Sequence, residues 1–317
     1  MINPNQILAQ RANFQGIFAK QQRTALHWRS SSLEERSARL VKLRNWIKRN
    51  QPGIRQALYE DFKKPEAEVD LSEIFPVTSE INHTLKNLKS WMKPQGISTP
   101  LSMFGTSGKI YYEPKGTALI ISPWNFPFNL TIGPLVSALA AGCTAIIKPS
   151  ELSPATSELI KKMVNEVFLP EEVEVCLGEV ETSQALLKLP FDHIFFTGSP
   201  EVGKIVMKAA AVNLTSVTLE LGGKSPAIID ESADLNDAAS KLVWGKFVNC
   251  GQTCIAPDYI LVHESLKERL IMELKVNLQK FYDPDFKGIE NSQDYARIIG
   301  SRHFKRLRNH LEDAMAK

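Results

Sequence analysis

Two cysteines stand four residues apart in a short polar segment, Asn249–Pro257. Neither has the paired Cys or His neighbours of a zinc site, and the six histidines lie elsewhere, so we expect no metal. A cysteine in a Gly-Gln-Thr-Cys turn after a helix can be an exposed nucleophile activated by backbone dipoles. Composition leaves this role and that of a small buried thiol equally open for Cys250 and Cys254. Cys143 and Cys176, at or beside predicted strands, fit the buried thiol better.

An acid stands at the end of a predicted strand in Thr218–Pro226. Glu220 is followed by Gly222 and Gly223, which would let a ligand or another backbone approach closely. We expect this strand-end glutamate to be partly buried, which is unusual for a carboxylate. A salt bridge with Lys224 is the alternative.

Polar residues also follow two earlier strands. Asn125 lies between two prolines in Pro-Trp-Asn-Phe-Pro, where a fixed amide can donate to a developing oxyanion. A rigid turn whose Asn bonds only its own backbone is the alternative. Lys148 and Glu151 can hold a ribose, or can belong to an ordinary charged loop.

A phosphate-binding turn is indicated by Phe195–Lys204. An apolar strand runs into Gly198, Ser199 can cap the helix that follows, and Pro200 suits its first position. Free backbone N–H groups at such a helix start can hold a phosphate. Taken alone, the pattern fits a well-capped turn equally.

Short β-prone runs alternate with helix-like stretches through the middle of the chain. They are Thr117–Ile121, Thr144–Ile147, Val173–Cys176, His193–Phe196 and Val217–Leu219. The alternation predicts right-handed crossovers and a parallel sheet covered by helices on both faces. Such a sheet binds ligands at the carboxyl ends of its strands. We therefore expect an α/β protein with a Rossmann-like parallel sheet.

Different predicted elements precede and follow these strands in the sequence. The first hundred residues are predicted to be helical, with Asn3 as one cap and a capping box at Ser32–Glu35. Residues 98–112 predict a protruding two-stranded β-ribbon whose loop is Gly105–Gly108. A second set of elements and a final charged, solvated helix follow. The strands of this set are predicted at Ala227–Ile229 and Tyr259–Val262, its helices at Leu235–Val248 and Ser265–Lys280, and the final helix at Arg302–Lys317.

The segment Gly116–Ile147 carries no charge, yet it does not predict a transmembrane helix. Its three prolines and two asparagines would burden a helix in the bilayer, and Leu135–Ile147 is too short to span one. We expect strand, loop, buried helix and strand. Lys+Arg 38 against Asp+Glu 35 gives no electrostatic reason for a nucleic-acid partner. Four scattered cysteines and a start without an export signal predict a cytoplasmic protein.

Five motifs in this order closely resemble the aldehyde dehydrogenase superfamily. They are Pro-Trp-Asn-Phe-Pro, Lys-Pro-Ser-Glu, Phe-Phe-Thr-Gly-Ser, Glu-Leu-Gly-Gly-Lys and Gly-Gln-Thr-Cys. The following Cys-Ile-Ala-Pro-Asp-Tyr-Ile-Leu further resembles the class 3 branch. The resemblance implies oxidation of an aldehyde, medium- or long-chain or aromatic, to a carboxylic acid with NAD or NADP.

The resemblance also implies roles for individual residues. Cys254 would be the nucleophile, Glu220 the general base and Asn125 the oxyanion donor, while Cys250 receives no catalytic role. Lys148 and Glu151 would bind the adenosine ribose, and Ser199 with Val202 the pyrophosphate. The expected cofactor-binding set is Trp124, Lys148, Glu151, Thr197, Gly198, Ser199, Val202, Leu221 and Gly222.

Four parts are expected along the chain. They are a helical N-terminal part of the dinucleotide-binding domain (1–96), an oligomerisation ribbon (97–115), the dinucleotide-binding α/β domain (116–216) and an incomplete catalytic domain (217–317). The family's Glu-Ile-Phe-Gly-Pro segment does not occur, so we expect a C-terminally truncated member. The alternative function is an impaired fragment that at most binds dinucleotide or associates with other subunits. The family's homodimer needs a final arm that this chain lacks, which counts against that dimer here.

Overall fold

The computed structural model describes residues 4–317, with side chains from residue 13 onward, so the expected Asn3 cap lies outside the described residues. The N-terminal part is helical. Its elements are α1 (Pro4–Trp28), α2 (Leu33–Arg49), α3 (Gln51–Phe62), α4 (Glu66–Val69), the π-helix η1 (Asp70–Ile74) and α5 (Phe75–Trp91). The capping box is confirmed: Ser32 Oγ accepts from Glu35 N at 3.2 Å, and the Glu35 carboxylate accepts from Ser32 N at 2.7 Å.

A five-stranded parallel sheet forms the centre of the molecule, as the sequence predicts. Its strands are β3 (Thr117–Ile121), β4 (Thr144–Lys148), β5 (Val173–Val175), β6 (His193–Thr197) and β7 (Ser216–Glu220), in the order β5-β4-β3-β6-β7. The crossover helices are α6 (Asn129–Ala141), α7 (Pro154–Val167), α8 (Val180–Leu186) and α9 (Pro200–Ala211). The strand order reverses at β3 and β6, so the ligand-binding crevice of this fold lies at their carboxyl ends.

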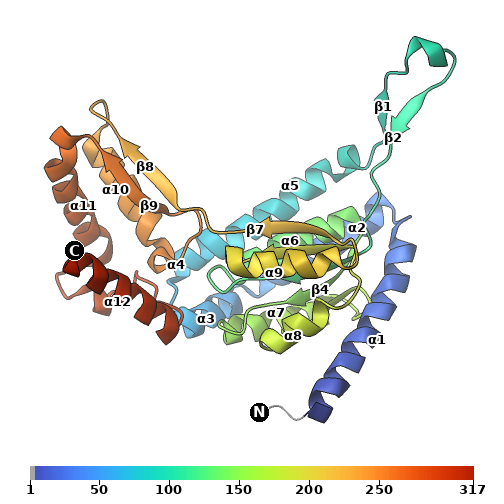
Figure 1. The fold of residues 1–317 in the computed structure, drawn as a ribbon, viewed down its shortest axis with the longest axis horizontal. Coiled ribbons are helices and arrows are strands. Elements are labelled where there is room, and N and C mark those ends of the chain that lie inside the picture. Colours follow the sequence, from blue (N-terminus) through green and yellow to red (C-terminus); the bar gives the residue numbers. More distant parts are fainter. Residues whose placement is uncertain (1–3) are drawn as a thin grey trace.

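Helices cover both faces of the sheet, which explains why its strands are apolar runs without alternation. On one face, Ile120 and Ile147 pack with buried residues of α2, α3, α5, α6 and α7. On the other, Leu119 and Ile194 pack with α1, α8 and α9. Figure 1 shows α9 in front of the sheet and α6 behind it.

The uncharged segment 116–147 folds as expected into β3, a loop, the mostly buried α6 and β4. Gly142 ends α6 with a φ of 86°, a left-handed position that favours glycine. Among the described residues, no helix has both the length and the apolar character needed to span a membrane.

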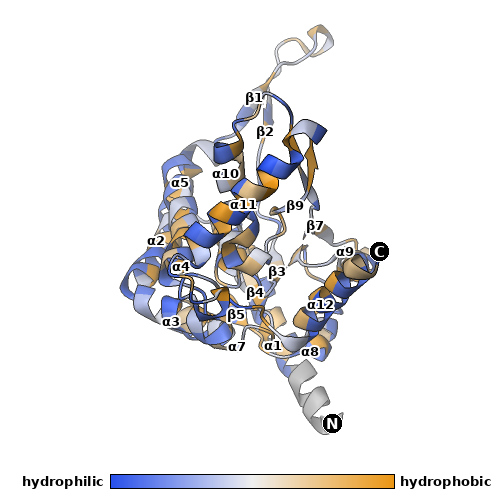
Figure 2. Cartoon of the chain, turned by 90° about the vertical axis from the view of Figure 1, so that its left-hand side faces the viewer, coloured by the Kyte–Doolittle hydropathy of each residue, from blue (hydrophilic) through white to orange (hydrophobic). Residues whose placement is uncertain are grey.

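The expected ribbon projects from the body of the molecule, as Figures 1 and 2 show from two sides. It pairs β1 (Gln95–Ile97) with β2 (Gly108–Ile110) in antiparallel register. The predicted loop is confirmed for Gly105–Ser107 but is wrong for Gly108, and the connection is longer than predicted, since it spans 98–107 and contains a 3₁₀ helix, η2 (Leu101–Met103). Gly108 belongs to a strand, where a Cβ would lie 2.7 Å from the Ile97 side chain.

A second, two-stranded parallel sheet joins β8 (Ser225–Ile229) to β9 (Pro257–Val262). Its helices are α10 (Leu235–Phe247), α11 (Lys267–Tyr282) and, farther along, α12 (Ser301–Ala316). Figure 1 shows β8, β9, α10 and α11 set apart from the five-stranded sheet. The expected boundary at 216/217 falls inside β7, which pairs with β6, so we propose residues 221–224 as the linker.

Candidate active site

Cys254 is exposed in the loop between α10 and β9. The chain reaches it through the 3₁₀ segment η3 (Val248–Gly251), in which Asn249, Cys250 and Gly251 have φ values of 56°, 54° and 73°. Three consecutive left-handed residues are uncommon, and two of them are not glycine. The residues that follow the turn contact the loop after β3 through Gln252 and the segment after β7 through Cys254.

Asn125 contacts this loop from the segment that follows β3. Its Nδ2 donates to the carbonyl oxygen of Gln252 at 2.9 Å, and its own carbonyl oxygen accepts from Asn249 Nδ2 at 2.8 Å. The alternative of an Asn bonded only to its own backbone is therefore wrong. An amide nitrogen carries two N–H groups, so one remains for another acceptor.

Gln252 and Asn249 hold the loop together, and sequence reasoning gave neither a role. Gln252 Nε2 donates to the carbonyl oxygens of Asn249 and Arg297, both at 3.0 Å. Gln252 Oε1 accepts from Ile299 N at 2.9 Å. Their place in the Asn-Cys-Gly-Gln-Thr-Cys motif could have indicated that Asn249 and Gln252 support the cysteine loop. No motif in the sequence marks Arg297 or Ile299.

Glu220 ends β7 and is exposed, so the expectation of a partly buried carboxylate is wrong. Lys224 instead pairs with Asp258, with Nζ 3.2 Å from Oδ1, and the alternative of a Glu220–Lys224 bridge is wrong as well. A Cβ on Gly223 would lie 2.8 Å from the carbonyl oxygen of Cys254. The absence of a side chain at Gly223 thus lets the segment after Glu220 lie against the Cys254 backbone.

The start of α9 has the expected geometry of a capped helix. Ser199 Oγ accepts from Val202 N at 3.3 Å, and Gly198 N donates to the carbonyl oxygen of Glu220 at 3.0 Å. Leu221 packs on the first turn, where a Cβ on Gly203 would lie 3.0 Å from it. Thr197 Oγ1 is buried without a hydrogen-bond partner in the described part of the chain.

Lys148 and Glu151 lie at the end of β4 and pair with each other, Nζ to Oε2, at 2.5 Å. The lysine is buried and the glutamate exposed. Gly222 is exposed, with nothing within 4 Å of the place where a Cβ would be.

Trp124, the neighbour of Asn125, packs against His303 of α12 with ring centroids 4.7 Å apart. Sequence reasoning missed His303, since α12 was expected to be a solvated face. Burial and the charges of Arg306 and Arg302 lower the pKa of His303.

The other cysteines differ from Cys254 in burial. Cys143 and Cys176 are buried, as expected, and burial raises the pKa of Cys176 to about 12. Cys250 is half-buried, and its pKa is raised by burial against the opposing effect of a hydrogen bond with Tyr295. Cys254 is thus the exposed thiol of the four.

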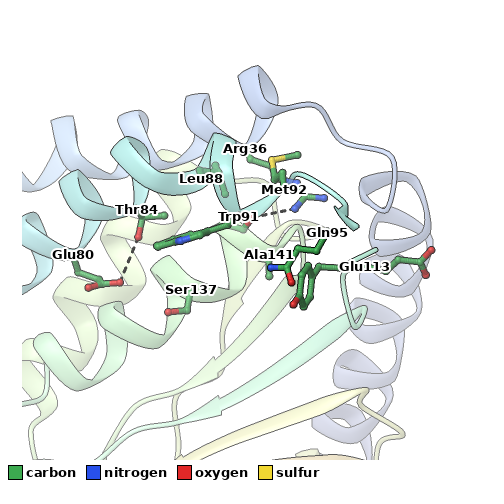
Figure 3. A pocket seen from close by; sticks show the side chains of 12 residues that line it. Arg36, Glu80, Thr84, Leu88, Trp91, Met92, Gln95, Glu113, Ser137 and Ala141 are labelled. Carbon is green, nitrogen blue, oxygen red and sulfur yellow. Dashed lines mark hydrogen bonds between the residues drawn. The ribbon is translucent and has the colours of Figure 1, made fainter. Parts of the chain in front are cut away.

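An apolar cavity of about 490 Å³ adjoins the Cys254 loop. It lies between α4, the Asn125 segment and α10 and is lined by Ala67, Glu68, Leu71, Ser72, Phe126, Trp244, Gly245, Val248, Thr253, Ile255, Ala256 and Pro257. A second cavity of about 540 Å³ lies at the base of the ribbon, between α2, α5 and α6. Figure 3 shows Trp91 and Glu80 lining it, and none of the expected site residues lines it.

The doubly wound α/β fold, in which the loop after β3 is hydrogen-bonded to the loop that carries the exposed thiol, fits an oxidoreductase. The model of the aldehyde dehydrogenase family matches residues 6–317. The chain belongs to the aldehyde dehydrogenase family.

Curated relatives include the class 3 branch. The 4,4'-diaponeurosporen-aldehyde dehydrogenase of Staphylococcus aureus is 48% identical over 88% of this chain and 60% of its own length. Aldehyde dehydrogenase family 3 member A2 of Pongo abelii is 43% identical over 90% of this chain and 59% of its own. The chain therefore spans about three fifths of the length of these relatives.

A solved structure gives the same result. The substrate-bound state of Staphylococcus aureus AldH superposes with a TM-score of 0.91 at 44% identity, covering 95% of this chain and 65% of that one. The expected fold class is thereby confirmed.

Proposed function

We propose that this chain carries the centre for NAD(P)-dependent oxidation of an aldehyde to a carboxylic acid, with Cys254 as nucleophile. The observation that carries the proposal is the hydrogen bond from Asn125 Nδ2 to Gln252 O, two residues before the exposed thiol. It joins the loop after β3 to the nucleophile loop. The close approach of Gly223 to the Cys254 carbonyl oxygen also brings the segment that begins with Glu220 against the nucleophile loop.

The chain's own groups divide the chemistry as follows. The Cys254 thiolate attacks the carbonyl carbon, and the second N–H of Asn125 with the Cys254 backbone N–H holds the oxyanion. When bound, the dinucleotide supplies the acceptor for the hydride of the tetrahedral carbon, which leaves a thioester on Cys254. Glu220 takes a proton from the water that cleaves this thioester. The carboxylic acid leaves, the Cys254 thiolate is restored, and Glu220 releases its proton to solvent.

The residues after β3, β4 and β6 fit a dinucleotide. The unpartnered Thr197 Oγ1 offers a hydrogen bond, and the capped start of α9 at Ser199 and Val202 presents backbone N–H groups to a phosphate. Lys148 and Glu151 would hold the adenosine ribose, with Trp124, Gly198, Leu221 and Gly222 around the ligand. A mouse relative is named NADP-preferring. We propose NAD or NADP for this chain.

The apolar cavity beside Thr253 supports an apolar substrate, which we propose to be a medium- or long-chain or aromatic aldehyde. Its Thr253 Oγ1 has no partner in the described part of the chain and lies next to Cys254 in sequence. Octanal and benzaldehyde, with acetaldehyde as the small control, test this choice by the reduced dinucleotide that each produces.

An alternative is a chain that binds dinucleotide with little turnover. The observation in its favour is the small β8–β9 sheet, which has two strands and exposes Ile228 and Leu261. The Cys254 loop, which leads into β9, is therefore supported by less packing than the loops of the five-stranded sheet. Tryptophan fluorescence during titration with NAD or NADP measures binding, and absorbance at 340 nm with octanal measures turnover. Binding without turnover would establish the alternative.

We further propose that the ribbon is an oligomerisation surface and that the protein is cytoplasmic. Leu101 and Phe104 at the ribbon tip are 88% and 90% exposed, which supports association through it. Light scattering of the chain and of a Leu101→Ser, Phe104→Ser variant tests association. The four free cysteines support a reducing compartment.

A further inference from the structure

The turn before Cys254 needs support from outside itself. Asn249 and Cys250 both occupy the left-handed region. For a residue with a side chain this conformation is unfavourable, because the Cβ lies too close to the following carbonyl oxygen. The Asn249 amide nitrogen is engaged, since its Nδ2 reaches the carbonyl oxygens of Asn125 and Gln252 at 2.8 and 3.3 Å, while its Oδ1 is buried without a partner among the described residues. Its backbone N–H points elsewhere.

That N–H donates to Glu68 Oε2 at 3.0 Å. Glu68 lies on α4, 181 positions earlier in the chain, and also lines the apolar cavity. Burial raises its pKa, although the Asn249 N–H and Lys64 favour the charged form. Burying a carboxylate in the apolar wall of a cavity costs free energy unless the carboxylate is hydrogen-bonded. The hydrogen bond that Glu68 accepts from the turn offsets part of this cost.

The same stretch of chain also holds the Asn125 loop. Glu73, in the π-helix η1, is fully buried, and its Oε2 accepts from Asn129 N at 2.8 Å at the start of α6. Its Oε1 accepts from the fully buried Lys64, whose Nζ lies 4.0 Å from the centre of the Phe126 ring. Residues 64–74 thus contact both loops, one through Glu68 and the other through Glu73 and Lys64.

We propose that Glu68 is a positioning residue, which holds the left-handed Asn249–Gly251 turn and thereby sets where Cys254 lies relative to Asn125. The inference rests on the proposed function and deepens it, because the thiol and the oxyanion donor would share residues 64–74 as one support. Misplacement of reacting groups by about 1 Å can cost roughly a hundredfold in rate. The hydrogen bond of Glu68 goes to the backbone of the turn and not to the Cys254 thiol.

Three variants of Glu68 separate its possible contributions. Glu68→Ala removes the acceptor, Glu68→Asp keeps the charge but withdraws it by one methylene, and Glu68→Gln keeps an acceptor at the same reach. Glu66→Ala is the matched control, because Glu66 is an exposed glutamate on the same short helix. Glu68→Asp also covers the case in which Glu68→Ala does not fold.

The first measurement is the rate at which limiting iodoacetamide labels Cys250 and Cys254 in the 317-residue chain, read by peptide mass spectrometry. In the parent, Glu66→Ala and Glu68→Gln proteins, Cys254 reacts first. In Glu68→Ala and Glu68→Asp the turn relaxes, and labelling of half-buried Cys250 rises about tenfold relative to Cys254. This equals about 1.4 kcal/mol, within the range for an unmet buried hydrogen bond.

The second measurement is turnover of octanal, in which Glu68→Ala lowers kcat about tenfold or more at an unchanged KM and Glu68→Gln restores it. Labelling needs no turnover, so it decides the role of Glu68 even where aldehyde oxidation is absent. The inference is overturned if Glu68→Ala and Glu68→Asp leave the labelling ratio unchanged. It is equally overturned if Glu68→Gln exposes Cys250 as much as alanine does, since the acceptor would then be irrelevant.

Discussion

Replacing Asn125 by alanine separates a structural hydrogen bond from a catalytic one. The structural loss is the bond from Nδ2 to Gln252 O. That carbonyl keeps a second donor, Asn249 Nδ2 at 3.3 Å, and is not left unpaired. The loss therefore falls near the lower end for a buried bond, about 1 kcal/mol, which lowers Tm by about 2–4 °C in a chain of this size.

The catalytic loss is larger. Removal of one donor to an oxyanion lowers the rate about 10²–10³-fold, or about 2.7–4 kcal/mol. Two assays report it: release of 4-nitrophenolate from 4-nitrophenyl acetate, which needs thiol attack but no dinucleotide, and reduced dinucleotide formed from octanal. Both rates should fall together in Asn125→Ala, because in both reactions an oxyanion forms at the carbonyl group that Cys254 attacks.

Asn129→Ala is the matched control. Asn129 Nδ2 donates to the carbonyl oxygen of Ser72 at 3.0 Å, a bond of the same kind from the same loop-to-helix segment. It should lower Tm by a similar amount and leave the ester rate within about threefold of the parent. The reasoning is refuted if Asn125→Ala shifts Tm without slowing ester cleavage, or if the two variants slow it equally.

Three further outcomes are expected. Cys254→Ala abolishes both reactions while Cys250→Ala leaves most of each, and a limiting alkylator labels Cys254 first; the reverse labelling order would transfer the role to Cys250. Glu220→Gln gives a burst of one equivalent of reduced dinucleotide and then little turnover, measured by stopped flow, whereas a normal steady state would make Glu220 dispensable. Burial raises the pKa of Glu68, so the native state holds a proton that the unfolded chain releases above about pH 4. The free energy of unfolding of the parent should therefore fall relative to that of Glu68→Gln as the pH rises from about 4 to the raised pKa, as measured by urea unfolding. If the unfolding free energies of the two proteins change with pH in parallel, the burial of the Glu68 carboxylate is contradicted.

The sequence predicted the five-stranded sheet because its strands are buried on both faces. A strand covered on both sides is a continuous apolar run, and Thr117–Ile121 matches β3 residue for residue. The capped turn at Ser199 was also predictable, since cap and proline lie within a few residues of one another. Both features depend on neighbours in sequence.

The errors arose where a residue's partner is distant in sequence. Gly108 read as loop because glycine is common in turns, but it faces Ile97 across the ribbon. Lys224 was paired with its near neighbour Glu220, although Asp258 reaches it from the adjoining β9. No pattern in the sequence indicates a partner 34 positions away.

The choice between Cys250 and Cys254 shows how the two kinds of information combine. Spacing and composition left both thiols open, because each stands in the same polar turn. The left-handed conformation at Asn249 and Cys250 turns the chain so that Cys250 packs toward Tyr295 while Cys254 reaches the surface. In that turn the Asn249 N–H donates to Glu68, a residue with no local motif. We therefore propose that the motif marks the reactive position, and that the geometry of this position depends on a helix that is distant in the sequence.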